Sequence, residues 1–229
     1  MNVEITAPSN PFTTDDTGKT PIHQHVYEQL RSKILFGDLA PGQAVTIQGI
    51  TSELNAGMTP VREAIRRLIA EGALTHKGNR RVSVPVLTAK SVEELGFMRK
   101  SLETELTRRA AVRMTTTQLD ELRLYDDDLN KAIAQGDIGG YLTHNYRFHA
   151  YIYSCAEASI ITETVDRLWL RFGPSLRVVC GRFGTNNLPD KHKDLLEALS
   201  ARDVEAAAKA MSEDVEQGIR QVRAALQSD

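Results

Sequence analysis

Residues 58–72 read "MTPVREAIRRLIAEG", and this stretch decides the fold of the first part of the chain. Thr59 followed by Pro60 is a helix-start signal, because the threonine oxygen can cap free N–H groups and proline suits the first helical position. Gly72 then predicts the helix end. The apolar residues between them recur at i, i+3, i+4 and i+7, the spacing of one buried helix face: Val61, Ala64, Ile65 and Leu68.

The cations of this predicted helix stand at its positive end. Arg62 lies in the first turn, where the helix dipole favours an anion, and Arg66 and Arg67 follow one turn later. One explanation is a solvated basic face in which Glu63 pairs with Arg66 or Arg67. The other is an external polyanion that meets the helix at this end, and the flanking sequence favours the second explanation.

The flanking segments predict two helices before this one and a hairpin after it. Residues 21–42 carry apolar residues at helical spacing and end in a Pro-Gly turn, and residues 46–57 fit a short second helix. Residues 73–86, "ALTHKGNRRVSVPV", read as two short strands around a turn at Lys77–Arg80. Three helices followed by a small hairpin are the layout of a winged helix-turn-helix, which places its third helix in the major groove of DNA.

The phosphates of DNA would supply the negative charge that Arg62 lacks at the positive end of the helix. We expect Arg62 to meet base edges or phosphates, Arg66 to reach phosphate or guanine, and Thr59 to reach phosphate. Arg80 and Arg81 in the wing suit the adjacent minor groove or the backbone.

Composition predicts a protein that is neither secreted nor embedded in a membrane. The 229 residues are 41% hydrophobic and 25% charged, which is ordinary for a globular protein. No apolar run approaches the length of a membrane span, and residues 1–19 are a polar, flexible lead rather than a secretory signal. Cys155 and Cys180 have no metal or redox spacing, so we expect a reduced, cytoplasmic protein.

The chain divides into a basic part and an acidic part. Residues 21–86 hold eight Lys and Arg against five Asp and Glu, whereas residues 87–229 hold 19 against 22. Only the first part is therefore expected to meet nucleic acid. We predict a mainly α protein: a winged helix-turn-helix at residues 20–86, then an all-α antiparallel bundle at 87–229. Its helices are predicted at 89–112, 116–134, 138–155, 158–179, 190–200 and 202–226.

Polar residues lie on apolar stripes of the predicted bundle. Asn145 and His149 follow one buried face of "YLTHNYRFHAYIY", one turn apart, and His192 leads the apolar face of "KHKDLLEALSARD". Asp214 lies on the edge of the stripe in the last helix. A hydrogen-bonded core side chain is the simpler explanation of each alone, and a metal ligand is the alternative. Buried polar groups without partners are costly, so four that converge need an explanation.

Arg99 is a further cation among inward-facing residues. In "VEELGFMRKSLETELTRRAA" it shares a side with Leu95, Met98, Leu102 and Leu106. An ion pair with Glu103, one turn later, would explain it, and a ligand carboxylate is the alternative.

The N-terminal part resembles the DNA-binding domain of GntR-family bacterial transcription regulators. The "GDLAPG" turn and the "TPVREAIRRLIAEG" block carry this resemblance, and the helical remainder resembles the FCD ligand-sensing domain of the FadR subfamily. It implies that Gln48, Thr59 and Arg62 occupy DNA-contacting positions. The chain departs from the family at Gly57-Met58, where Ser-Arg is usual, and in the wing "KGNRRVSV", where a glycine usually follows the arginine.

The same resemblance implies a metal and an effector. Family members bind a divalent metal through an Asp and three His; here Asn145 stands at the Asp position and Asp214 at the last His position, beside His149 and His192. Two imidazoles, a carboxylate and an amide oxygen suit Zn²⁺, Ni²⁺ or Mn²⁺. Arg99 stands at a position that often binds an effector carboxylate. The implied protein is a homodimeric repressor of a near-palindromic operator, released by a small organic acid.

Two other functions are compatible with these residues. A metal-dependent enzyme could use the His/Asp cluster as its catalytic centre, although the sequence shows no dedicated general base and no nucleophile motif, so no enzyme is predicted. A regulator whose metal site has decayed, with a larger uncharged ligand, would also fit the changes at Asn145 and Asp214.

Overall fold

The computed structural model describes residues 21–78, 81–183 and 191–227. The expected flexible lead at 1–19 lies outside this part. Within it the chain is mainly α, with one small sheet, which confirms the predicted fold class. Its elements are α1 (Ile22–Leu35), β1 (Ala44–Val45), α2 (Ile47–Leu54), α3 (Met58–Ala70), β2 (Thr75–Lys77), β3 (Arg81–Ser83), α4 (Ala89–Arg113), α5 (Thr116–Gln135), α6 (Ile138–Ser154), α7 (Ser159–Phe183), α8 (Lys191–Ser200) and α9 (Val204–Gln227).

The N-terminal part is a winged helix-turn-helix. Helices α1 and α2 both pack against α3, and the wing is an antiparallel sheet of order β1-β3-β2. Thr75 and Ala44 lie opposite Ser83 on its two sides. Strand β1 was not predicted, because its two residues are too short to show an alternating pattern.

Helix α3 begins two residues earlier than predicted. Gly57 is its N-cap, in an extended conformation with φ −71° and ψ 154°, so Thr59 is not the cap and Pro60 is not the first helical residue. This correction leaves the Thr59 side chain exposed and without a capping role. At the other end Gly72, with φ +76°, reverses the chain as predicted, and its N–H bonds the carbonyl of Ile69 at 3.0 Å.

The C-terminal part is a helical bundle in which α4 packs on α9, α5 on α6, and α8 on α9. Local caps fix several helix starts: Thr88 and Thr115 form capping boxes, and Asp137 accepts from the N–H of Gly140. The predicted helices agree within two residues, except that α7 continues to Phe183, beyond the predicted 179. The apolar spacing of Leu176, Val179, Cys180 and Phe183 continues to this end, so the predicted end was placed too early. None of the described helices is long and apolar enough to cross a membrane.

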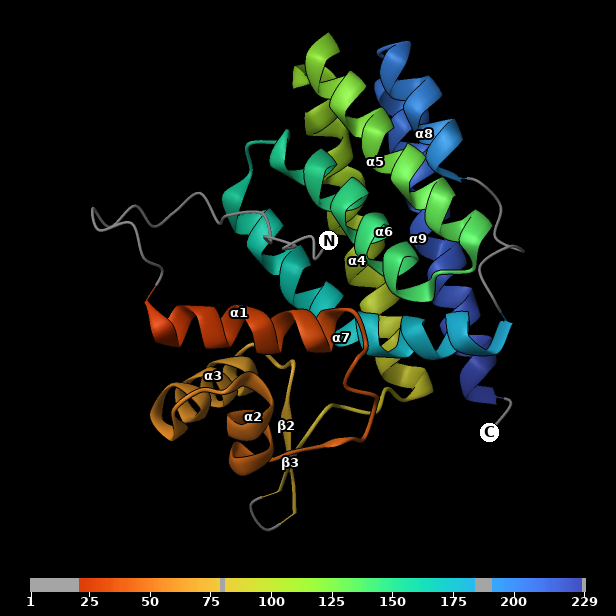
Figure 1. The fold of residues 1–229 in the computed structure, drawn as a ribbon. Helices are drawn as coiled ribbons and strands as arrows, with labels where there is room; N and C mark the ends of the chain where they lie inside the picture. Colours follow the sequence, from red (N-terminus) through yellow and green to blue (C-terminus); the bar gives the residue numbers. More distant parts are fainter. Residues whose placement is uncertain (1–20, 79–80, 184–190, 228–229) are drawn as a thin grey trace.

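Helix α1 joins the two parts of the molecule. Figure 1 shows it lying between the winged part and the bundle, with the start of α2 and α3 on one side and α7 on the other. Its end approaches α7 so closely that a Cβ on Gly173 would lie 2.0 Å from the carbonyl oxygen of Leu35. Arg31 pairs with Asp166 at 3.2 Å, and Tyr146 donates to the same carboxylate at 2.7 Å. The winged part is thus packed directly against the bundle through α1.

Candidate DNA-binding surface and metal centre

The predicted DNA contacts lie on the exposed side of the winged helix. Thr59, Arg62 and Arg66 are exposed on α3, opposite the buried face that carries Val61 and Leu68. Gln48 is exposed on α2 and Arg81 on β3. Arg80, the other wing arginine, lies outside the described residues.

The arginines of α3 differ in their partners. Arg62 and Arg66 form no ion pair with any described residue, and neither does Glu63, so the basic face is not neutralised from within the described chain. Arg67 instead lies 3.6 Å above the ring of Tyr27 and donates to Glu71 at 3.1 Å. Arg67 therefore holds α3 to α1, while Arg62 and Arg66 remain available to an external anion.

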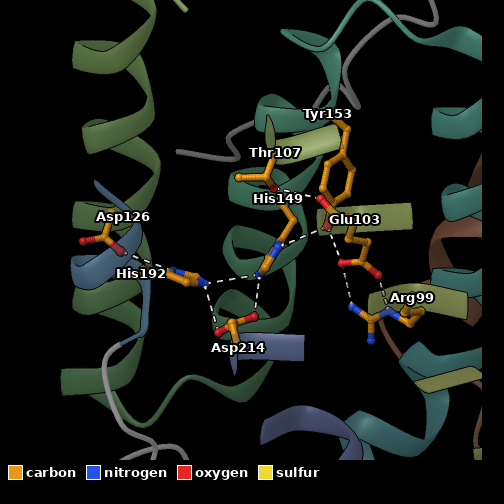
Figure 2. A network of polar contacts seen from close by, with 8 residues as sticks. All are labelled: Arg99, Glu103, Thr107, Asp126, His149, Tyr153, His192 and Asp214. Atoms are coloured by element: carbon orange, nitrogen blue, oxygen red, sulfur yellow. Dashed lines mark hydrogen bonds and ion pairs between the residues drawn. The ribbon is translucent and has the colours of Figure 1, made fainter. Parts of the chain in front are cut away.

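The polar residues predicted to converge in the bundle come from three helices. Figure 2 shows His149 on α6, His192 on α8 and Asp214 on α9 pointing toward one another. One ligand atom from each lies within 4.8 Å of the others. The Nε2 atoms of the two histidines are 3.3 Å apart, and Asp214 Oδ2 is 3.2 Å from His149 Nε2.

Packing fixes both imidazole rings. His149 is fully buried on the apolar face of α6, beside Phe148 and Ile152. The ring of Phe148 stacks on His192 at 4.0 Å with an interplanar angle of 8°. The apolar face of α6 therefore holds both rings in place: His149 is part of this face, and Phe148 on it contacts His192.

The outer nitrogen of each histidine has a partner that sets its tautomer. Asp126 Oδ1 lies 3.3 Å from His192 Nδ1, and a carboxylate accepts, so this nitrogen carries the proton. Tyr153 donates its hydroxyl proton to Glu103, so its oxygen accepts from His149 Nδ1, 3.2 Å away. In its neutral form, each imidazole would thus present an unprotonated Nε2 to the centre.

The centre consequently gathers lone pairs without a proton between them. His149 Nε2 lies 3.3 Å from His192 Nε2 and 3.2 Å from Asp214 Oδ2, and His192 Nε2 lies 4.0 Å from Asp214 Oδ1. Burial raises the pKa of Asp214, but when the histidines are protonated, the hydrogen bond that His149 then donates and the positive charges of His149, His192 and Arg99 outweigh it and lower this pKa to about 2. Asp214 is therefore an anion at neutral pH, and only a cation, a proton or a metal ion, satisfies the three groups.

The three residues fit a divalent metal. Zinc–nitrogen bonds of about 2.0 Å in a tetrahedral site separate neighbouring ligand atoms by about 3.3 Å. The separations of 3.3 Å between the two Nε2 atoms and 3.2 Å between His149 Nε2 and Asp214 Oδ2 match this, and the other carboxylate oxygen, Oδ1, lies 4.0 Å from His192 Nε2. The protonated outer nitrogens held by Asp126 and Tyr153 are the usual support of metal-binding histidines.

Asn145 and Arg99 lie beside this cluster. Asn145 lines the same small cavity as Arg99 and Asp214, and its side chain forms no hydrogen bond with a described residue. Arg99 is 2% exposed and forms the predicted pair with Glu103, at 2.5 Å from Nε and 3.2 Å from Nη2. Its guanidinium lies 4.1 Å from the Trp169 ring centroid.

One residue of α4 does not lie where it was predicted, and two residues that support the cluster were not predicted. Met98, predicted to face inward, is 40% exposed, because the buried stripe of α4 passes through Arg99 and Glu103 instead. Tyr153 could have been found, since it stands one turn after His149 on the same face. Asp126 could have been found as well, since it alone of three successive aspartates lies on the stripe of Leu122 and Leu129.

Comparisons with known proteins agree with both parts of this description. Residues 22–84 match the gntR family of bacterial regulatory proteins, and residues 94–217 match the FCD domain. The chain is 28% identical over 197 residues to the HTH-type transcriptional regulator McbR of Escherichia coli K12, covering 85% of this chain and 89% of McbR. It is 25% identical over 210 residues to the HTH-type transcriptional repressor RspR of the same organism, covering 89% and 91% of the two chains.

A solved structure is similar as well. The structure of E. coli McbR/YncC superposes with a TM-score of 0.85 at 26% identity and covers 92% of this chain and 100% of that one. The family and these relatives are transcription regulators, which confirms the expectation that the chain is not a metal-dependent enzyme. The chain therefore belongs to the GntR family of bacterial transcription regulators and carries an FCD domain.

Proposed function

We propose that this regulator is a cytoplasmic, sequence-specific repressor whose operator binding is controlled by a small organic acid held in the helical domain. The division at residues 86 and 87 separates its reading part from its sensing part. The single observation that carries the DNA-binding role is the pair of exposed arginines, Arg62 and Arg66, which have no ionic partner among the described residues at the positive end of α3.

Recognition of the operator DNA would involve α3, α2 and the wing together. Arg62 and Arg66 suit guanine and phosphate, Thr59 and Gln48 add polar contacts, and Arg80 and Arg81 follow the adjacent backbone or minor groove. A homodimer would present two such helices about one DNA turn apart, so the operator should be near-palindromic. The repressor role is supported by the similarity to RspR, which is named a transcriptional repressor.

Sensing would combine a metal ion with Arg99. His149, His192 and Asp214 would hold Zn²⁺, Ni²⁺ or Mn²⁺, and Asn145 supplies an amide oxygen near the cavity that Arg99 and Asp214 share. What supports the metal is the tautomer assignment, which directs three lone pairs at one point. When bound, the metal supplies an open position for an effector oxygen, while Arg99 retains N–H donors for a carboxylate.

Coupling between the parts would pass through α1. The α1–α7 contact at Gly173 and the Arg31–Asp166–Tyr146 contacts place the DNA-reading part against helices that border the cluster. Tyr146 also packs edge-on against Trp169, 5.5 Å between centroids, and Trp169 stacks on Arg99. A coupling of about 1–3 kcal/mol would suffice for control.

The function is tested by transcription in vitro from a promoter that overlaps a site selected by the protein from random duplex DNA. We expect the wild-type protein to lower transcript yield, and Arg62→Ala to leave it unchanged. An increase in transcript with bound wild-type protein would contradict repression while leaving DNA binding intact. Light scattering of the same sample should give twice the mass of one chain; a monomer would contradict the homodimer.

A further inference from the structure

Helix α3 begins with a large apolar side chain that the fold does not use. Met58 is the first residue of α3 and is 52% exposed, whereas the buried face of the helix starts at Val61. Among the described residues it belongs neither to the apolar core nor to the partly buried hydrophobic residues packed against that core. A single exposed apolar residue is ordinary on a protein surface, so the meaning of Met58 depends on its neighbours.

Met58 lies in one row with the two arginines that lack an ionic partner in the described part of the chain. Met58, Arg62 and Arg66 follow one another at intervals of four residues, so each side chain lies one turn from the next. Helical side chains tilt toward the N-terminus, and the N-cap Gly57 has no side chain that could cover Met58. The Met58 side chain therefore projects at the end of α3 that a helix-turn-helix directs at the bases.

The chemistry of methionine restricts what Met58 can contact in the major groove. A thioether has no N–H or O–H to donate, so it cannot satisfy the N7 and O6 acceptors of guanine, and covering them would leave them without partners at a cost in free energy. The 5-methyl group of thymine is the apolar group that the base edges present there. Contact between this methyl group and Met58 removes apolar surface of both from water, which is favourable.

We infer that Met58 is a specificity-determining residue that selects a thymine in each half-site of the operator through apolar contact with its 5-methyl group. This inference rests on the proposed function, because it concerns the same DNA-binding surface. One helical turn, the distance from Met58 to Arg62, rises about 5.4 Å, which is less than two base-pair steps of about 3.4 Å each. The thymine should therefore lie within two base pairs of the base that Arg62 contacts.

Replacement of thymine by deoxyuracil removes this methyl group alone and keeps the pairing with adenine. An operator is first selected from random duplex DNA by the full-length protein. Each thymine is then replaced in turn, with both half-sites changed together, and affinity is measured by fluorescence anisotropy at fixed salt. At one thymine we expect the replacement to weaken binding about fourfold for each half-site, the value of one buried methyl group.

The variant Met58→Ala tests the residue itself. It should bind the selected operator more weakly than the wild type, and deoxyuracil at the sensitive position should cost it no further affinity. Met98→Ala is the matched control, because Met98 is also an exposed methionine, at 40%, but lies on α4 in the helical domain. This control should lose as much affinity to deoxyuracil as the wild type does.

A second variant, Met58→Arg, tests whether this position chooses the base. When the selection is repeated with it, guanine should replace thymine at the sensitive position, because guanine O6 and N7 both accept from an arginine. Unchanged selection of thymine would contradict the role of Met58.

The remaining outcomes separate this inference from the proposed function. If the wild-type protein selects an operator but deoxyuracil weakens binding at none of its thymines, Met58 reads no methyl group, although sequence-specific binding stands. A deoxyuracil penalty that persists in Met58→Ala would assign the methyl contact to another residue. If the wild-type protein selects no operator, the proposed function fails, and the inference fails with it.

Discussion

The two candidate sites of this chain handle charge in opposite ways. On α3 the side chains of Arg62 and Arg66 are exposed and have no ionic partner in the described residues, so their charge is available to a partner outside the chain. In the bundle His149 and Glu103 are fully buried, and nearly every polar atom has a partner within the cluster. The exception is the point where the two Nε2 atoms of His149 and His192 approach the carboxylate of Asp214.

Because of this difference, substitutions at the two sites should affect DNA binding and folding stability differently. Removal of an exposed, unpaired cation should cost affinity for DNA and little stability, because nothing in the folded chain depends on it. Removal of a buried partner should cost stability as well as ligand binding, because it leaves another buried group unsatisfied. Four changes break or sharpen this contrast, and they follow from the largest expected effect to the smallest.

Gly173→Ala should break the contact that joins the two regions. Its Cβ would lie 2.0 Å from the backbone carbonyl oxygen of Leu35, which cannot turn aside as a side chain can. We expect a loss of about 3 kcal/mol of unfolding free energy, or about 6–12 °C in Tm for a chain of this size. Gly181→Ala on the same helix is the control, because a Cβ there meets no atom within 4 Å. Equal Tm values for the two variants would show that α1 does not rest on α7 as described.

Zinc should stabilise the wild-type chain through the buried cluster. At a free concentration of one hundred times Kd, we expect a gain of about 2.7 kcal/mol, seen as a rise in Tm of about 5–10 °C relative to chelated protein. His149→Gln should abolish this gain. His144→Gln should keep it, because His144 lies on the same helix but outside the cluster. A zinc-induced rise that survives in His149→Gln would place the metal elsewhere.

Arg62→Ala should weaken operator binding by about 1–3 kcal/mol, with a change in stability within about 0.5 kcal/mol. Fluorescence anisotropy with a labelled operator and thermal melting measure the two quantities. Arg67→Ala is the matched control on the same helix: it removes the contacts with Tyr27 and Glu71, so it should lower stability and leave operator affinity little changed. The reverse pattern would exchange the roles assigned to these two arginines.

Arg81→Ala should have the smallest effect, because a wing cation near the phosphate backbone adds affinity without sequence information. We expect weaker binding to operator and non-operator DNA alike, and a decrease of about 1 in the slope of log affinity against log salt. Binding measured across a salt series checks this. A loss confined to the operator would mean that Arg81 reads bases.

The fold could be predicted from sequence because its signals are local. Thr88 and Thr115 cap the starts of α4 and α5 with their side chains, and Gly136 ends α5 with a positive φ, so the boundaries of most helices were predicted within two residues. Strand β1 was not predicted from the sequence, because Ala44 and Val45 form a strand only by pairing with β3. Met98 was misplaced because hydrophobicity was taken to define the buried stripe, whereas the ion pair of Arg99 and Glu103 occupies it.

The candidate cluster could be predicted only in part. His149, His192 and Asp214 stood out because each interrupts or borders an apolar stripe, and the structure brings the three together. The support of their tautomers depends on distances between helices, which no local pattern records: Asp126 comes from α5 and Glu103 from α4. The sequence thus indicated which residues meet, while packing determines which nitrogen of each histidine faces the centre.

The central claim, that α3 and the wing read a specific DNA sequence, is tested most directly by selection from the genome. Purified protein is mixed with fragmented DNA of its own genome at fixed, near-physiological salt, because phosphate contacts make affinity strongly dependent on salt. The retained DNA is then sequenced, with Arg62→Ala in parallel. We predict enrichment of one or a few near-palindromic sites with the wild type and their loss with the variant. Uniform recovery of all fragments by the wild-type protein would contradict sequence-specific reading by this surface.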